Sequence, residues 1–375
     1  MKKLICSALI LISIVAAKAQ PVAGSTIETQ KQKFVLQSVT TELQRPWGMA
    51  FLPDGRILVT ELAGEIRIIK EDKLLDEKIS GVPEVFNNGQ GGLLDIQLHP
   101  DYAKNGWIYI TYAKPDGTKG GGTTVIRAKL KGNTLTNIEQ LFNAQPSSPS
   151  GAHFGSRIVF DGNGYIFFSC GERGKMENAQ DLTNHLGKIM RLHDDGRVPT
   201  DNPFVNTAGA KPEIWSYGHR NPQGLYYDKT TGTLWDDEHG PKGGDELNKV
   251  EKGKNYGWPV ITYGIGYDDK PLTDITKKDG MEQPVRYWVP SIAPCGMTMV
   301  TGNKYPNWKG NFLVGALSFQ LVARVEVVDG KFVAEERFLE KIGRVRTVVQ
   351  SPDGYIYVAT ENPGKIYKLM PEPEK

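Results

Sequence analysis

A short unit that recurs along the chain constrains its fold more than any other feature. In each copy, a glycine-containing turn precedes a run of apolar and β-branched residues. The clear copies lie at residues 53–61, 161–169 and 352–361, and weaker copies lie at residues 104–110, 231–235 and 309–314. Asp-Gly favours a tight turn, and a short apolar run bounded by turns is typical of a buried strand. The repetition therefore predicts six related β-sheet units.

Six such units predict an all-β chain folded as a six-bladed β-propeller. Radial repetition protects the edges of small sheets, which otherwise pair with other chains. The units are spaced more widely than the roughly 40 to 50 residues of a bare blade, so the excess is expected in loops. A strand at residues 34–36 would complete the last blade and close the ring. Residues 31–371 are expected to form this single domain, and a β-sandwich is the alternative.

The first nineteen residues have the pattern of a secretory signal peptide. Lys2 and Lys3 precede an apolar run at residues 4–17, and the small-x-small triplet Ala17-Lys18-Ala19 follows. No later stretch approaches about 18 uninterrupted apolar residues, so no membrane span is expected. We therefore predict cleavage near Ala19 and a periplasmic or secreted mature protein.

Charge and cysteine content exclude several classes of function. The chain has 45 Lys and Arg against 43 Asp and Glu, a net charge of +2 that gives no electrostatic reason to expect a nucleic-acid partner. No CxxC, Cys/His cluster or HExxH has the spacing of a zinc site. We expect Cys170 and Cys295 to be two buried thiols, although export leaves a disulfide open.

Polar residues gather in loops, where a propeller is expected to carry its function. Gln90 lies in a glycine-rich bend, which is as typical of a tight turn as of a site. His153 stands in a glycine-flanked loop before the third repeat, and histidine suits proton abstraction near neutral pH. Arg220 and Asn221 project from a proline-fixed turn. For each loop the alternative is a purely structural one, a solvated turn or a side chain that takes no part in function.

An acidic segment at residues 236–246 and a turn at residues 255–259 suggest a cation site. Carboxylates, together with carbonyls exposed by Gly and Pro, are the hard oxygen ligands that calcium takes. The spacing is not that of an EF-hand. A solvated acidic turn remains the alternative.

Taken in order, these segments resemble the glucose/sorbosone dehydrogenase family, and in particular its soluble aldose sugar dehydrogenases, over residues 40 to 370. Each motif is short, but the ordered set is specific. The motifs are Arg45-Pro46-Trp47-Gly48, residues 89–94, His153 with Gly155 and Arg157, residues 218–224, 238–241 and 255–259, Ala293-Pro294 with Gly296-Met297, and Arg344-Val345-Arg346. The resemblance implies a six-bladed propeller that uses pyrroloquinoline quinone (PQQ) and Ca²⁺.

The resemblance also implies a role for each matching residue. His153 is similar to a general base that takes the proton of an anomeric hydroxyl, and Arg220 is similar to the electrostatic partner of the quinone oxygen. Gln90 is similar to a residue that touches substrate and cofactor. Residues similar to those that bind the carboxylates of the cofactor are Asn221, Arg344 and Arg346. Calcium ligands are implied at the carbonyls of Gly240 and Pro241, and at Glu246 with the Tyr256 carbonyl for a second, structural ion.

Two positions depart from the family pattern. Ser318 stands where relatives carry a lysine that contacts the cofactor, so one cationic contact is missing. Ala152 replaces the Asp or Asn that usually precedes the histidine, which changes the expected sugar contacts. A lost charge-assisted hydrogen bond weakens binding by about 1.5 to 3 kcal/mol.

The implied activity is oxidation of the anomeric carbon of an aldose to a lactone, with an external electron acceptor. The residues leave two other functions open. A propeller that has lost cofactor affinity through Ser318 could bind sugar or protein without catalysis, and a calcium-dependent lactonase is the second alternative. The sugar, the acceptor and the choice between monomer and homodimer are not determined by the sequence.

Overall fold

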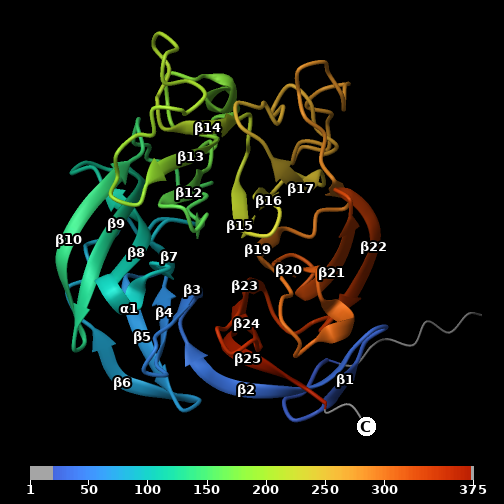
Figure 1. Ribbon diagram of the computed structural model, residues 1–375. Coiled ribbons are helices and arrows are strands. Elements are labelled where there is room, and N and C mark those ends of the chain that lie inside the picture. Colours follow the sequence, from blue (N-terminus) through green and yellow to red (C-terminus); the bar gives the residue numbers. More distant parts are fainter. Residues whose placement is uncertain (1–19, 373–375) are drawn as a thin grey trace, which may run out of the picture.

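The computed structural model describes residues 20–372, and these form a ring of six small antiparallel sheets (Figure 1). The predicted signal peptide, residues 1–19, lies outside the described residues. The first three blades run from the innermost to the outermost strand as follows: blade I has β3 (Pro46–Phe51), β4 (Ile57–Glu61), β5 (Glu65–Lys70) and β6 (Lys73–Ile79); blade II has β7 (Leu93–Leu98), β8 (Trp107–Pro115), β9 (Gly121–Lys131) and β10 (Thr134–Asn143); blade III has β11 (Ile158–Phe160), β12 (Tyr165–Cys170), β13 (Lys188–His193) and β14 (Ile214–Tyr217).

The other three blades continue the ring. Blade IV has β15 (Pro222–Asp228), β16 (Thr233–Glu238), β17 (Asp245–Val250) and β18 (Arg286–Trp288); blade V has β19 (Pro294–Met299), β20 (Phe312–Ala316), β21 (Leu321–Val328) and β22 (Lys331–Phe338); blade VI has β23 (Val345–Gln350), β24 (Ile356–Glu361), β25 (Gly364–Pro371), β2 (Lys33–Leu43) and β1 (Thr26–Glu28). The described helices are single turns: α1 (Tyr102–Asn105), η1 (Met176–Gln180) and η2 (Pro306–Trp308). The predicted six-bladed propeller is confirmed.

Every predicted repeat is the second strand of a blade. The six copies become β4, β8, β12, β16, β20 and β24. These strands need an apolar run because they are covered on both faces by the neighbouring blades. For example, Leu58 of β4 packs with Ile108 of blade II, and its neighbour Val59 packs with Ala359 of blade VI. The hydrophobic core is therefore a set of layers between blades, and the sequence repeat reflects that shared burial.

The ring is closed by the strand expected near residue 34. Phe34 of β2 pairs with Pro371 of β25, and Leu36 pairs with Leu369. Phe34 and Leu36 are fully buried, with the aromatic ring of Phe34 against Trp308 of blade V. Strands from the two ends of the chain therefore share blade VI, as predicted.

The cysteines are free and buried, which confirms the favoured prediction of two buried thiols. Burial raises the pKa of the Cys170 thiol to about 12. Both side chains belong to the interior of the propeller, Cys170 on β12 and Cys295 on β19.

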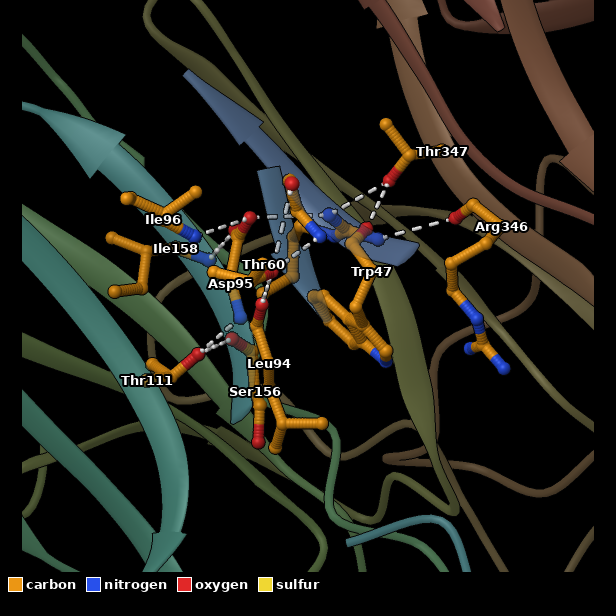
Figure 2. Close-up of polar contacts among 12 residues, drawn as sticks. Trp47, Thr60, Leu94, Asp95, Ile96, Thr111, Ser156, Ile158, Arg346 and Thr347 are labelled. Atoms are coloured by element: carbon orange, nitrogen blue, oxygen red, sulfur yellow. Dashed lines mark hydrogen bonds and ion pairs between the residues drawn. The ribbon is translucent and has the colours of Figure 1, made fainter. Parts of the chain in front are cut away.

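Buried hydroxyl groups join the early blades around the centre of the ring. Thr111 of β8 donates a hydrogen bond to the Ser156 carbonyl at 2.7 Å and accepts one from the Asp95 amide at 2.9 Å. Thr60 of β4 contacts the Leu94 carbonyl in the same way, and Figure 2 shows both contacts. Each hydroxyl bonds to the innermost strand of the next blade or to the chain that leads into it. These contacts fix neighbouring blades to each other.

An ion pair between Asp95 and Arg157 lies at the same centre. Asp95 is fully buried, and its Oδ1 accepts hydrogen bonds from the Ile96 amide (3.0 Å) and from Arg157 (3.2 Å). Its Oδ2 accepts the Ile158 amide at 3.0 Å, so both oxygens are satisfied (Figure 2). The Arg157 guanidinium stacks 4.1 Å from the Trp47 ring and also donates to Gln223 and Thr347. Five blades thus meet at one arginine.

Candidate active site

The loops of Gln90 and His153 lie against each other, although 63 positions separate them in the chain. The Gln90 side-chain oxygen accepts the His153 amide at 3.0 Å, and the Gln90 amide donates to the Gly151 carbonyl at 2.7 Å. Gly89 permits this approach because a Cβ there would lie 2.5 Å from the Gly151 oxygen. The glycine-rich bend is therefore both a required turn and the support of Gln90.

Glu172 orients the imidazole of His153. The Nδ1 atom of His153 contacts Oε2 of Glu172, whose side chain is only 2% exposed. A partner on Nδ1 fixes the ring and leaves Nε2 for other partners. His153 itself has φ 53°, a left-handed conformation that is uncommon outside glycine and often marks a functional position. Sequence reasoning missed Glu172, although it follows the strand of the third repeat by two residues.

Arg220 and Asn221 precede β15 and reach the same region. The Glu172 amide donates to the Arg220 carbonyl at 3.0 Å, and the Gly155 amide donates to Asn221 Oδ1 at 3.2 Å. These two bonds join the His153 loop to the Arg220 loop. The guanidinium of Arg220 is held by the carbonyls of His239 (3.1 Å) and Gly240 (2.8 Å). A fixed positive charge of this kind suits stabilisation of an oxygen that becomes negative.

A continuous polar chain connects Asn221 to the two predicted carboxylate-binding arginines. Gln223 donates to Asn221 Oδ1 at 3.1 Å and accepts from Arg346 at 2.8 Å. Glu361 then bridges Arg346 (2.6 Å) and Arg344 (2.8 Å). Burial disfavours the Glu361 carboxylate, but the charge of Arg346 and the hydrogen bonds of both arginines outweigh it and bring the pKa to about 2. Sequence reasoning missed Gln223 and Glu361.

Ser318 lies at the outer end of this chain. The residue is exposed, just beyond β20, and Arg344 donates to the carbonyl of its neighbour Leu317 at 3.4 Å. The predicted residues Gln90, His153, Arg220, Asn221, Arg344, Arg346 and Ser318 thus lie along one connected path. The structure brings them together from blades II to VI.

Two buried nitrogens on this path have no hydrogen-bond partner among the described residues. They are Nδ2 of Asn221 and Nε2 of His239. Burial and the positive charges of Arg346 and Arg220 hold the pKa of His239 well below its usual range, so its imidazole is neutral. Buried polar atoms are normally paired, so these nitrogens favour a polar ligand at this place. The donor set of arginines, amide and imidazole fits a compact molecule rich in oxygen, as a quinone with carboxylates is.

The turn of Gly240 and Pro241 is built as a rigid support beside Arg220. The Gly240 amide donates to Asp245 Oδ1 at 2.9 Å, and Asp245 also accepts the hydroxyl of Ser291 and the amide of Ala293. The Gly240 carbonyl already accepts Arg220. A carbonyl oxygen has two lone pairs, so the bond to Arg220 leaves one for a cation.

Glu246 belongs to a buried acidic cluster that sequence reasoning saw only in part. Its neighbour Asn248 donates to Glu246 at 3.2 Å and to Glu238 at 3.3 Å. Asp236, on the same face of blade IV, has both oxygens buried with no hydrogen-bond partner among the described residues. Burial and the charge of Glu238 raise the pKa values of Asp236 and Glu246 well above their usual range.

One imidazole faces these carboxylates. His219 Nδ1 lies 3.1 Å from Glu238 and 3.6 Å from Asp236, and its ring stacks on that of Tyr256 with centroids 4.6 Å apart. Three carboxylates and one imidazole leave negative charge in a closed space, which fits a hard divalent cation. The structure thus places Glu246 and Tyr256 at one cluster with Asp236 and Glu238 of the predicted acidic segment, and it adds Asn248.

Between residues 20 and 372 no helix is long and apolar enough to cross a membrane.

Comparison with known proteins identifies the family. The family model for Glucose / Sorbosone dehydrogenase matches residues 43–368. Aldose sugar dehydrogenase YliI of Escherichia coli is 42% identical over 337 residues, which cover 88% of this chain and 91% of that protein. Quinoprotein glucose dehydrogenase B of Acinetobacter calcoaceticus is 26% identical over 449 residues, with 96% and 93% covered.

Solved structures agree with these relatives. The apo-form of the soluble aldose sugar dehydrogenase from Escherichia coli superposes with a TM-score of 0.87 at 40% identity, over 90% of this chain and 99% of that one. The PQQ-bound form of an aldose sugar dehydrogenase from Streptomyces coelicolor gives 0.75 at 29% identity, over 94% and 100%. The chain therefore belongs to the glucose/sorbosone dehydrogenase family.

Proposed function

We propose that the protein is a quinoprotein that oxidises the anomeric C1 hydroxyl of aldose sugars to the lactone. Membership of the family supports the general activity, which is oxidation of the CH–OH groups of sugars. The observation that carries the finer proposal is the connected path from His153 through Arg220 to Arg346, with two unpartnered buried nitrogens beside it. PQQ, when bound, supplies the oxidant that accepts a hydride from the anomeric carbon.

His153 is the proposed general base. Glu172 holds Nδ1, so Nε2 is the atom that accepts the proton of the anomeric hydroxyl. The negative charge of Glu172 also favours the imidazolium that forms. Gln90 keeps the loop in place through the His153 amide. The imidazole side chain is only 13% exposed, which limits competition from water for the same hydrogen bond.

Arg220 is the proposed partner of the oxygen on which charge develops. Its guanidinium is fixed by two carbonyls and lies 5.4 Å from the Trp258 ring, so it needs no reorganisation when charge appears. Arg344, Arg346 and Asn221 are the proposed holders of the cofactor. Arginine presents a planar fork that matches a carboxylate.

Calcium is proposed at two places. The carbonyls of Gly240 and Pro241 would hold one ion close to Arg220, and the acidic cluster around Glu246 with the Tyr256 carbonyl would hold a structural ion. Buried carboxylates without hydrogen-bond partners in the described part of the chain support the structural ion. The remaining lone pair of the Gly240 carbonyl supports the ion close to Arg220. An external electron acceptor completes the turnover. The leader pattern of residues 1–19 supports a periplasmic or secreted location.

The direct test is reconstitution of the purified protein with calcium and PQQ, followed by dye reduction with several aldoses. We expect turnover in the wild type and a loss of at least about a hundredfold in kcat for His153→Ala, because general-base catalysis contributes about 10² to 10⁴. Quinone binding, followed by absorbance, should persist in this variant. His99→Ala serves as the control, since His99 contacts Asp194 at the far end of blade III.

Two outcomes would contradict the proposal. Full turnover by His153→Ala would remove the assigned base. A wild type that takes up no quinone but binds sugar would instead be a binding propeller.

A further inference from the structure

Arg45 occupies a position that the proposed function does not use. It precedes Pro46 at the start of β3 and has φ 49°, in the left-handed region that side chains rarely adopt. Backbone strain of this kind persists where the surrounding structure imposes it and clusters at binding sites. The guanidinium is exposed and donates to the Gly89 carbonyl at 3.3 Å. The side chain of Arg45 therefore contacts the loop that carries Gln90.

Two cavities meet at Arg45. One is a narrow cavity that Arg45 lines together with Gln90, Gln223 and Arg346. The other has a volume of about 620 Å³ and is lined by Arg45, Arg344, Glu361 and the turn 362–364. This volume lies within the range of about 300 to 1,000 Å³ that is usual for small-molecule sites. The larger cavity thus adjoins the proposed cofactor site through the side chain of Arg45.

The charges around these cavities do not balance. Arg344 and Arg346 share the single carboxylate of Glu361. Arg45 has no salt bridge with any residue from Gln20 to Glu372, so three arginines face one carboxylate. In the same range, Nε and Nη1 of Arg45 and Nη2 of Arg344 donate no hydrogen bond. The cavity offers two positive side chains with free N–H groups.

We propose that Arg45 and Arg344 form a carboxylate-binding subsite in the larger cavity. An unpaired guanidinium with free N–H groups in a concave site selects a planar anion. The inference rests on the proposed function for its ligand, which is a carboxylate of the quinone. Arg45 then supplies the cationic contact that Ser318 lacks. The carboxylate of an acidic sugar would offer the same chemistry.

Isothermal titration of the calcium-loaded apoprotein with PQQ tests the assignment without turnover. We expect Arg45→Ala to weaken quinone binding by about tenfold to a hundredfold, the size of one charge-assisted hydrogen bond. Arg45→Lys should recover part of this loss, because charge remains while the planar fork is lost. Arg197→Ala, which removes a 73% exposed surface arginine of blade III, should bind like the wild type.

A second variant tests whether Arg45 replaces the family lysine as a cationic contact or only supports the structure. Ser318→Lys in the Arg45→Ala background should restore most of the quinone affinity, since it returns a cation to the same ligand. A structural defect at Arg45 would not respond to a lysine on blade V. Circular dichroism and the melting temperature should match the wild type in each variant.

Titration with galacturonate, an acidic sugar, separates the two sources of the carboxylate. Weaker galacturonate binding by Arg45→Ala, with unchanged quinone affinity, would assign the subsite to substrate. Unchanged affinity for both ligands in Arg45→Ala would overturn the subsite while leaving the proposed function intact. A wild type that binds galacturonate through Arg45 but takes up no PQQ would contradict the proposed function, and it would assign the carboxylate of the subsite to the sugar.

Discussion

Asp95 and Asp236 are both fully buried, yet their surroundings differ completely. Asp95, at the centre of the ring, has both oxygens satisfied by two backbone amides and Arg157. Asp236, in blade IV, has neither oxygen satisfied by a described residue and lies beside Glu238. Burial raises the pKa of both carboxyls. A buried carboxylate with a complete set of partners holds blades together, whereas one without partners indicates a place for a cation.

The largest expected effect is loss of the Asp95–Arg157 pair. Asp95→Asn keeps the shape of the side chain but leaves the Arg157 charge buried and unpaired. We expect the free energy of unfolding to fall by about 3 to 5 kcal/mol. Urea denaturation measures this, and the loss should be the same with calcium and with a chelator. A loss that calcium restores would mean that Asp95 also serves a cation.

Glu361 is intermediate in character between Asp95 and Asp236. Both of its carboxylate oxygens are paired, as those of Asp95 are, but the residues that pair with them are proposed cofactor ligands. Glu361→Gln should reduce stability at neutral pH by about 1.5 to 3 kcal/mol, the range for a charge-assisted hydrogen bond. The folded carboxyl has a pKa of about 2 against a usual value of 4.5. Its contribution is therefore complete above pH 4.5 and is lost as the pH falls toward 2.

Urea denaturation of wild type and Glu361→Gln between pH 7 and pH 2 checks the sign of this dependence. The difference between the two proteins should shrink across the window from pH 4.5 to 2. A constant difference over the whole range would contradict the assignment of the low pKa to Glu361.

The smallest expected effect is an increase in the free energy of unfolding, whereas the first two are decreases. In calcium-free protein, Asp236→Asn should raise the free energy of unfolding by about 1 kcal/mol, because it removes the cost of burying a carboxyl next to Glu238, the same cost that raises the pKa of Asp236. The same variant should lose most of the stabilisation that calcium gives the wild type. Thermal unfolding over a calcium titration measures both, with Asp228→Asn, on the partly exposed end of β15, as the control. Destabilisation by Asp236→Asn without calcium would remove the contrast with Asp95.

The fold was predictable because each repeat contains, within a few consecutive residues, the turn and the apolar run that produce its strand. The turn at Asp54-Gly55 and the apolar run after it are required by a strand covered on both faces, and that requirement recurs in every blade. The sequence also singled out His153 and Arg220 as residues in unusual loops, and the resemblance to a known family predicted that they share one site. The structure joins their two loops through hydrogen bonds.

Partners of these residues were not predictable, because they depend on which chains meet in space. Glu172 has no motif of its own and becomes significant only through its contact with His153. Asp236 and Asn248 face each other through the register of β16 and β17, which the sequence does not specify. Arg45 belongs to a motif that looks like an ordinary turn, and only the cavities beside it indicate a further use.

The way blade VI is shared has a consequence for biosynthesis. β2 is made among the first described residues but pairs with β25, which ends at Pro371. A nascent chain on the ribosome therefore holds the edge of β2 without its partner until synthesis is almost complete. A product truncated before β25 would lose the strand that connects β2 to β24, and with it the last blade. Premature termination near the end of the message is thus expected to leave an open ring with two unpaired strand edges, which is a target for proteolysis and aggregation.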